Sequence, residues 1–129
     1  MGDELARLIE VMDRLRSPGG CPWDAEQSHE SLARHAIEEV YELTDAIESG
    51  TREDLREELG DVLLQVVFHA QMANEHNDFD FNDVVQSVSE KMVRRHPHVF
   101  GEGEIADAEA QTKAREEQKA RERDAGGKG

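Results

Sequence analysis

An all-α fold, an antiparallel bundle of about four to five helices, is predicted by three features of the sequence. Apolar residues recur every three or four positions over four separate stretches, which is the period of a helix that buries one face. Clusters of glycine, proline, serine and asparagine separate these stretches. No stretch alternates apolar and polar residues as a strand does. The length of 129 residues suits one hydrophobic core and not two.

The first helix is predicted from the spacing of Leu5, Leu8, Ile9, Met12 and Leu15. It ends in the turn-forming residues 17–20. After a loop at residues 21–24, a second helix begins near Asp24 or Ser28, and Asp24 and Gln27 have capping-box spacing. This helix runs to Ser49, where Gly50 suits the position just after a helix end.

Residues 51–54 are expected to cap the third helix. Its apolar positions are Leu55, Leu59, Val62, Leu63, Val66, Val67 and Ala70. They follow helical spacing throughout, so this helix is expected to carry much of the core. A fourth helix is marked by Phe81, Val84, Val85, Val88 and Met92. It starts in the polar stretch 77–82 and ends before Pro97.

The C-terminal segment, residues 102–129, differs in composition from the rest of the chain. Its only large apolar residue is Ile105, so it has little to bury and is expected to be a charged, solvated helix or a disordered tail. The predicted domain therefore covers residues 1–101.

The composition of the chain disfavours several classes of partner and location. The 15 Lys and Arg residues against 30 Asp and Glu give a formal net charge of −15, which disfavours nucleic acid as a partner. The single cysteine, Cys21, has no intramolecular disulfide partner, and the N-terminal segment lacks the apolar stretch of a signal peptide. No apolar run approaches the length needed to cross a bilayer. We expect a soluble cytoplasmic protein that does not bind membranes.

Acidic residues are concentrated in the segment between Glu38 and Asp61, which holds ten acids and only two bases, Arg52 and Arg56. Like charges three or four positions apart on a helix repel one another, so a positive group is expected between them. A divalent cation is the simplest candidate. The alternative is an ordinary solvated acidic face.

The spacing of the acids supports the cation. Glu38-Glu39-x-x-Glu42 and Glu58-x-x-Asp61 place carboxylates one turn apart on two helices joined by a short turn. Oxygen ligands with water suit Mg²⁺ or Mn²⁺, whereas zinc prefers nitrogen and sulfur. Such metals point to phosphate-containing substrates.

Helical geometry distinguishes the two acids of each adjacent pair by the direction they face. Glu58 flanks the apolar stripe of its helix, whereas Glu57 faces water. On the preceding helix the expected apolar stripe is Ile37, Val40, Thr44 and Ile47. Glu39 lies nearer the edge of this stripe than Glu38, and Glu42 falls on the far side. A second packed surface, such as a dimer interface, would explain the position of Glu42.

These residues resemble the MazG-type nucleoside triphosphate pyrophosphohydrolases, whose metal motif is EExxE followed by ExxD. Four flanking segments are also similar to that family, at residues 12–16, 19–24, 55–70 and 94–101. The resemblance covers residues 5–115. It implies an all-α, Mg²⁺-dependent enzyme, with Mn²⁺ as a substitute. It also implies hydrolysis of a nucleoside triphosphate between the α and β phosphates, and assembly as a homodimer or homotetramer.

The resemblance also implies roles for individual residues. The metal ligands carry over to Glu39, Glu42, Glu58 and Asp61. Glu38 is expected to contact the metal ligands without binding the metal itself, or to orient the attacking water. Either Glu38 or Glu39 could accept the proton of that water.

Substrate contacts are expected from a basic group near the end of the fourth helix, namely Lys91, Arg94 and Arg95. Without the resemblance, these cations would be interpreted as side chains that stabilise the C-terminus of the helix by interacting with its dipole. Trp23 is a candidate for stacking on the base, although a lone tryptophan is more often core or interface filler. The family stretch that contains a Lys-Ala-Arg sequence corresponds to Lys113–Arg115, and Lys113 is expected to bind substrate. The tryptophan that commonly precedes it is absent here.

Two other functions remain open. A di-iron or di-manganese carboxylate bundle would require Glu-x-x-His on two helices, and neither Glu39 nor Glu58 has a histidine three positions on. A non-catalytic helical interaction module would bind metal without turnover.

Overall fold

The computed structural model describes residues 2–101 and 108–126. The chain forms two compact units, Met1–Val84 and Val85–Gly129, which are described separately. The described residues form helices and no strands, as the sequence predicts. The helices are α1 (Gly2–Arg16), α2 (Pro22–Glu26), α3 (His29–Ser49), α4 (Arg52–Glu75), α5 (Phe81–Arg94), α6 (Pro97–Phe100) and α7 (Ala108–Gly126).

The connection from α1 to α3 contains a turn and one short helix. Gly19 has a φ of 86°, a left-handed conformation that glycine adopts at little cost. The expected loop at residues 21–24 is largely the helix α2. Ser28 caps α3 through a reciprocal capping box with Ser31. The alternative start at Asp24 is wrong, because the side chain of Gln27 instead donates a hydrogen bond to the backbone of the α2 segment.

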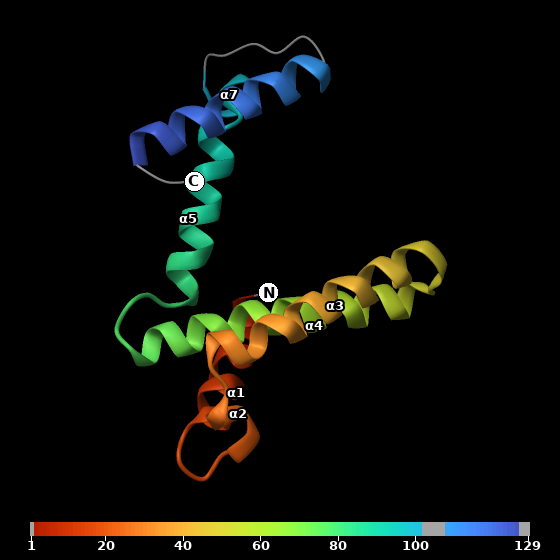
Figure 1. Ribbon diagram of the computed structural model, residues 1–129, viewed down its shortest axis with the longest axis vertical. Coiled ribbons are helices and arrows are strands. Elements are labelled where there is room, and N and C mark those ends of the chain that lie inside the picture. Colours follow the sequence, from red (N-terminus) through yellow and green to blue (C-terminus); the bar gives the residue numbers. More distant parts are fainter. Residues whose placement is uncertain (1, 102–107, 127–129) are drawn as a thin grey trace. The chain divides into compact units, whose positions relative to one another are not determined.

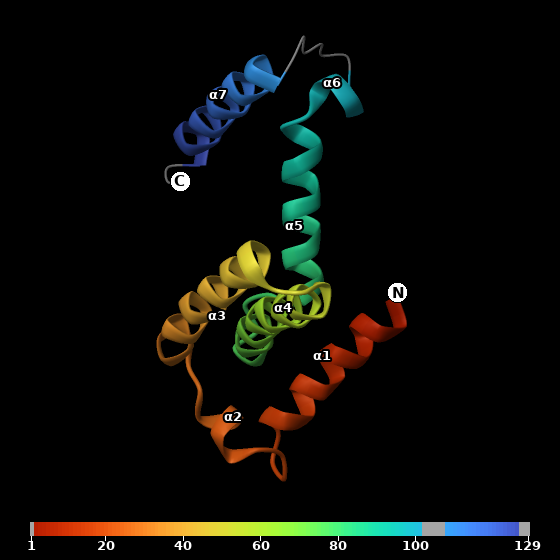
Figure 2. The same cartoon turned by 90° about the vertical axis from the view of Figure 1, so that its right-hand side faces the viewer.

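Helices α3 and α4 form an antiparallel hairpin (Figure 1). The turn is tight at Gly50, where a Cβ atom would lie 2.9 Å from the backbone oxygen of Ala46. Gly50 has a φ of −93°, so close approach rather than a left-handed backbone requires glycine there. Thr51 and Asp54 form the capping box that starts α4, as predicted. This hairpin sets two long helices side by side (Figure 2).

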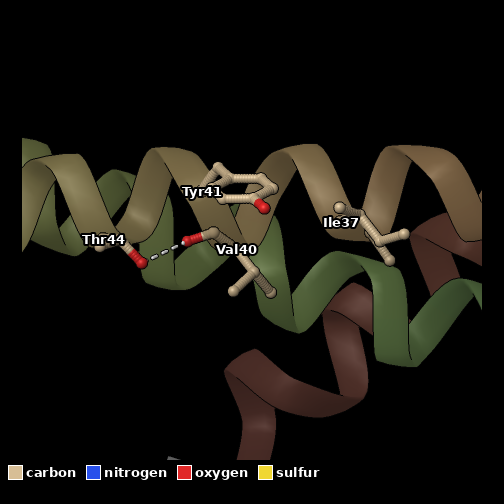
Figure 3. A pocket seen from close by; sticks show the side chains of 5 residues that line it. Ile37, Val40, Tyr41 and Thr44 are labelled. Atoms are coloured by element: carbon tan, nitrogen blue, oxygen red, sulfur yellow. Dashed lines mark hydrogen bonds between the residues drawn. The ribbon is translucent and has the colours of Figure 1, made fainter.

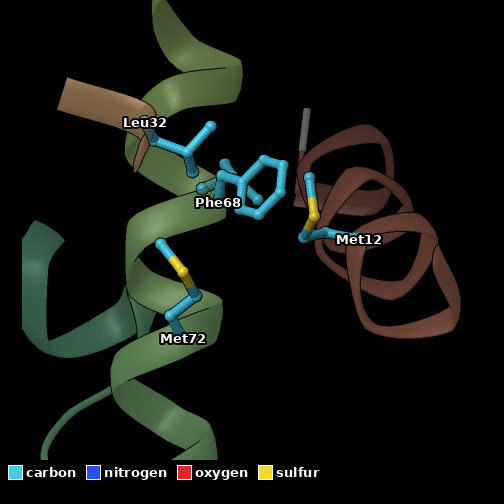
Figure 4. Packing of buried hydrophobic residues seen from close by; sticks show 5 residues of the cluster. Met12, Leu32, Phe68 and Met72 are labelled. Atoms are coloured by element: carbon cyan, nitrogen blue, oxygen red, sulfur yellow. The ribbon is translucent and has the colours of Figure 1, made fainter. Parts of the chain in front are cut away.

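The core of the first unit lies where α1 and the start of α3 meet the second half of α4 (Figure 4). It is formed by Met12, Leu32, Val67, Phe68 and Met72. As expected, α4 carries much of this core, since Val67, Phe68 and Met72 lie on it. Leu59, Leu63 and Val66 of the same apolar stripe are exposed instead. Helix α1 packs on α4, and the buried residues of α4 begin only at Val67.

Arg16 fastens the end of α1 to its neighbours. Its guanidinium pairs with Glu75 at the end of α4, with Nε 2.8 Å from Oε2. It also donates hydrogen bonds to the backbone oxygens of Asp24 and Gln27, at 2.6 and 3.2 Å. The charge lies 5.5 Å from the ring centre of Phe68. One side chain therefore joins α1, the α2 segment and α4.

The second unit contains most of α5 together with α6 and α7. Helix α5 starts within the first unit, where Asp80 and Asp83 bond each other's backbone N–H groups, and it ends before Pro97, as predicted. Residues 108–126 of the C-terminal segment are helical, while Ile105 lies outside the described residues. The domain boundary at residue 101 stays a prediction. None of the described helices has the length and apolar character needed to cross a membrane.

Candidate metal centre

The face of α3 that packs on α4 differs from the one expected. The shielded positions are Leu32, Ala36, Glu39, Leu43 and Ala46, which follow helical spacing. The expected stripe is wrong, because Ile37, Val40 and Ile47 are exposed. Glu39 therefore sits within the face of α3 that packs on α4, and Glu42 lies one turn further along the helix. No second surface is needed to explain why Glu42 is near the cluster.

The matching face of α4 is formed by Leu55, Glu58, Val62 and Gln65, all partly buried. The geometric choice between the doubled acids is confirmed here, since Glu58 is partly buried and Glu57 is exposed. Asp61 lies one turn beyond Glu58 and is exposed. The antiparallel pairing brings this end of α4 to the middle of α3.

Three carboxylates from the two helices converge. Glu39, Glu58 and Asp61 each place an oxygen so that these atoms all lie within 4.8 Å of one another. Glu42 contributes to the same electrostatic environment, since its charge acts on both Glu39 and Glu58. The structure thus brings together the four acids that the sequence assigns to metal binding. Glu38 is exposed beside them, with Oε2 4.0 Å from Nδ1 of His35.

The proximity of these acids changes their titration. Burial raises the pKa of Glu58 above its ordinary value, and the charges of Glu42, Asp61 and Glu39 add to the increase. Burial also raises the pKa of Glu39, followed by the charges of Asp61, Glu42 and Glu38. Both shifts record the same fact, that negative charges lie close together where water reaches them poorly.

The cluster fits a hard divalent cation. Oε2 of Glu39 and Oε2 of Glu58 are buried and have no hydrogen-bond partner within the described structure. A buried carboxylate oxygen without a donor is costly, and a cation would satisfy both atoms at once. The donors in the cluster are all carboxylate oxygens, which suits Mg²⁺ or Mn²⁺.

Trp23 contacts a histidine of α3. Its ring meets the ring of His35 edge to face, with centroids 5.9 Å apart. His35 is one helical turn before Glu39 on α3. Trp23 is about half exposed, at 53%, so part of its surface is accessible.

The expected basic residues belong to the second unit. Lys91 and Arg94 lie in the last turn of α5, Arg95 follows it, and Lys113 is exposed on α7. Both arginines already hold an internal anion, since Arg94 and Arg95 pair with Glu122 of α7. Sequence reasoning missed this contact because nothing in the spacing relates Glu122 to residues 27 and 28 positions earlier.

A pair of stacked histidines was also missed. The rings of His29 and His69 are parallel, with centroids 4.9 Å apart and Nδ1 atoms at 2.6 Å. Burial and the neighbouring His29 lower the pKa of His69. These residues join the start of α3 to α4. Their separation of 40 positions leaves no local sequence signal.

The fold and the site define an all-α protein with a carboxylate cluster suited to a divalent cation between two antiparallel helices. The sequence profile of the MazG nucleotide pyrophosphohydrolase domain matches residues 27–100, which include every residue of the cluster. The chain belongs to this family.

Individual relatives agree. The nucleoside triphosphate pyrophosphohydrolase/pyrophosphatase MazG of Thermotoga maritima is 56% identical over 95 residues, covering 74% of this chain and 37% of that protein. The nucleoside triphosphate pyrophosphohydrolase of Escherichia coli is 52% identical over 101 residues, or 78% of this chain and 38% of that protein. The chain thus spans little more than a third of these relatives.

A solved structure covers nearly the whole fold. The crystal structure of a mazG-related protein from Thermotoga maritima matches with a TM-score of 0.70 and 31% sequence identity. The match covers 89% of this chain and 98% of the other. The chain therefore shares its all-α arrangement with this mazG-related protein.

The raised pKa values predict how the metal-free protein responds to pH. The folded state favours protonated Glu39 and Glu58, so their contribution is most favourable below the ordinary pKa and is lost as pH rises through the raised values. In chelator, we expect the free energy of unfolding of the wild type, relative to that of Glu58→Gln, to fall as pH rises above the ordinary glutamate pKa of 4.5. Glu58→Gln should therefore be more stable than the wild type at pH 7. Urea unfolding measures both.

The matched control is Glu57→Gln, which removes the same charge from an exposed neighbouring position. It should keep the wild-type slope. If Glu58→Gln keeps that slope as well, or destabilises the protein at pH 7, the carboxylates do not repel one another as described.

Proposed function

We propose that the protein is a Mg²⁺-dependent nucleoside triphosphate pyrophosphohydrolase. It would cleave the bond between the α and β phosphates and release a nucleoside monophosphate and pyrophosphate. The observation that carries the proposal is the convergence of Glu39, Glu58 and Asp61 with two buried, unpartnered carboxylate oxygens. The names of the relatives from Thermotoga maritima and Escherichia coli support the same reaction.

The proposed ligands are Glu39, Glu42, Glu58 and Asp61. Bound Mg²⁺, or Mn²⁺ as a substitute, supplies neutralising charge for the polyphosphate and lowers the pKa of a water molecule. The hairpin of α3 and α4 holds the four side chains at fixed positions, so little rearrangement is needed on binding. Helix packing at Leu43 and Val62, which neighbour the cluster in sequence and are partly buried, supports this rigidity.

Glu38 is proposed to orient the attacking water and to accept its proton. It adjoins the cluster, yet it is exposed and lies outside the group of converging oxygens. A carboxylate that does not bind the metal is a better base than one that does, which favours Glu38 over Glu39 for this step. His35, 4.0 Å from Glu38, would help to hold that carboxylate in place.

Substrate contacts are proposed for five residues. Trp23 would stack on the base, since its half-exposed ring touches His35 one turn from Glu39. Lys91, Arg94, Arg95 and Lys113 would contact phosphate groups. The reaction would serve to cleanse or control nucleotide pools. We place it in the cytoplasm, with nucleic acid excluded as a partner by the net charge of −15.

A homodimer or homotetramer is proposed because the hairpin leaves a wide apolar surface open. On α3, Ala36, Ile37, Val40, Tyr41 and Thr44 line a depression of about 470 Å³ (Figure 3). On α4, Leu59, Leu63 and Val66 are exposed as well. Large apolar surfaces of this kind are typical of interfaces. A second hairpin would cover them and complete the bundle.

The reaction is tested with a panel of canonical and modified nucleoside triphosphates, in Mg²⁺ or in chelator. Pyrophosphate and orthophosphate are assayed separately. We expect pyrophosphate and monophosphate only in the presence of Mg²⁺. Glu42→Gln and Asp61→Asn should each reduce kcat by at least about 100-fold, a typical loss when a group that stabilises the transition state is removed.

Controls separate chemistry from folding. Both variants should keep the helix content of the wild type, measured by circular dichroism, and Asp45→Asn, an exposed acid on α3, should keep wild-type activity. Orthophosphate as the only product would contradict α–β cleavage. Binding of Mg²⁺ without turnover would instead indicate the non-catalytic interaction module.

The assembly is tested by sedimentation equilibrium at micromolar concentration. The wild type should have at least twice the chain mass of 14.5 kDa. Ile37→Lys should shift it towards the monomer, because a charge would enter the apolar contact. Glu48→Lys, on an exposed position of the same helix, serves as the control and should leave the mass unchanged. A wild type that sediments as a monomer would overturn this assembly.

A further inference from the structure

One carboxylate of the second unit is bound as a phosphate group would be. Nε of Arg94 donates to Oε2 of Glu122 at 2.8 Å, and a terminal nitrogen of Arg95 donates to Oε1 at 2.6 Å. The side-chain amide of Gln118 donates to Oε2 at 3.3 Å. Both oxygens of Glu122 therefore accept charge-assisted hydrogen bonds, one from each of two consecutive arginines.

The sequence of helix α7 offers few apolar side chains for packing. From Ala108 to Gly126 it contains no leucine, isoleucine, valine, methionine or aromatic residue, so apolar burial contributes little to its placement. The ion pairs of Glu122 are among the contacts that join it to the end of α5 within the second unit. An anion that competes for the arginines would remove these ion pairs and weaken the attachment of α7.

The two arginines are suited to a larger anion. Guanidinium groups bind phosphate oxygens in the same way as carboxylate oxygens. The side chain of Arg94 remains 49% exposed in the pair, so an incoming anion can reach it while Glu122 is still bound. A polyphosphate chain carries several negative charges against the single charge of Glu122, and Coulomb attraction therefore favours exchange.

We propose that Arg94 and Arg95 form a polyphosphate-binding site which Glu122 occupies when no substrate is bound, so that polyphosphate binding displaces Glu122 and releases α7. The ligand class is a polyphosphate, and its identification with the substrate's triphosphate rests on the proposed function. In this arrangement α7 competes with substrate, and Glu122 raises the substrate concentration that the enzyme needs.

The competition persists across the physiological pH range. Hydrogen bonds from Arg95, and then from Arg94, lower the pKa of Glu122 to about 2. Glu122 therefore stays ionised at any pH above that value, and protonation cannot release it near neutrality. Competition by another anion, or screening by salt, can separate the pair at neutral pH.

The test uses tripolyphosphate as the probe, with the full chain in chelator, so that turnover is not needed. We expect Glu122→Gln to bind tripolyphosphate about 3- to 10-fold more tightly than the wild type, since removing a partly exposed ion pair frees the arginines at modest cost. Glu117→Gln removes an equal charge from an exposed position on the same helix and controls for the general field. It should bind like the wild type.

A second arm tests the site itself. Arg94→Gln combined with Arg95→Gln should weaken tripolyphosphate binding at least about 10-fold, and adding Glu122→Gln to this variant should produce no further gain. Equal affinity in Glu122→Gln and Glu117→Gln, or weaker binding in Glu122→Gln, would overturn the proposal. The latter would show that Glu122 positions the arginines rather than competing for them.

A third readout does not depend on any variant. Saturating tripolyphosphate should speed the amide hydrogen exchange of α7 in the wild type. Slower or unchanged exchange would overturn the release of α7. These binding results are independent of turnover. If the protein releases no pyrophosphate but Glu122→Gln binds tripolyphosphate more tightly, the proposed reaction is refuted and the displacement of Glu122 by polyphosphate still stands.

Discussion

Carboxylates that repel one another lie at the contact of α3 and α4. The hairpin places Glu39 and Glu58 on the faces through which the two helices pack, where an apolar pair would be more stable in the free chain. Natural sequences accept such a local conflict at functional sites and compensate for it elsewhere. Here the compensation comes from the core around Phe68 and from the Arg16 contacts, both beyond the acidic end of the hairpin.

The sequence predicted the elements better than the faces. Helix ends were readable because Ser28, Gly50 and Thr51 act locally, through caps and one tight turn. The inward face of α3 was misjudged because the most apolar stripe, which includes Ile37 and Val40, is exposed in the single chain. Periodicity finds an apolar face, but it does not say whether the same chain or a partner covers it. Glu58 was placed correctly, because it flanks the apolar stripe expected for α4 and also lies on the partly buried face of α4.

Contacts between distant residues were beyond the reach of the sequence. Spacing within the C-terminal helix gives no reason to link Glu122 with the arginines of α5, nor His29 with His69. The acidic group was different, because its members lie on two consecutive helices joined by a short turn and local geometry suffices to bring them together. Charge pairing also occurs in the second unit, where Arg94 and Arg95 both pair with the carboxylate of Glu122.

The acids between α3 and α4 are proposed to hold a divalent cation. The most direct measurement is an anomalous difference map from crystals grown with Mn²⁺. A peak is expected between Glu39, Glu58 and Asp61, with oxygen ligands at about 2.0–2.3 Å and with Glu42 contributing to the coordination. A map without a peak there, from crystals in which the hairpin is intact, would contradict the proposal.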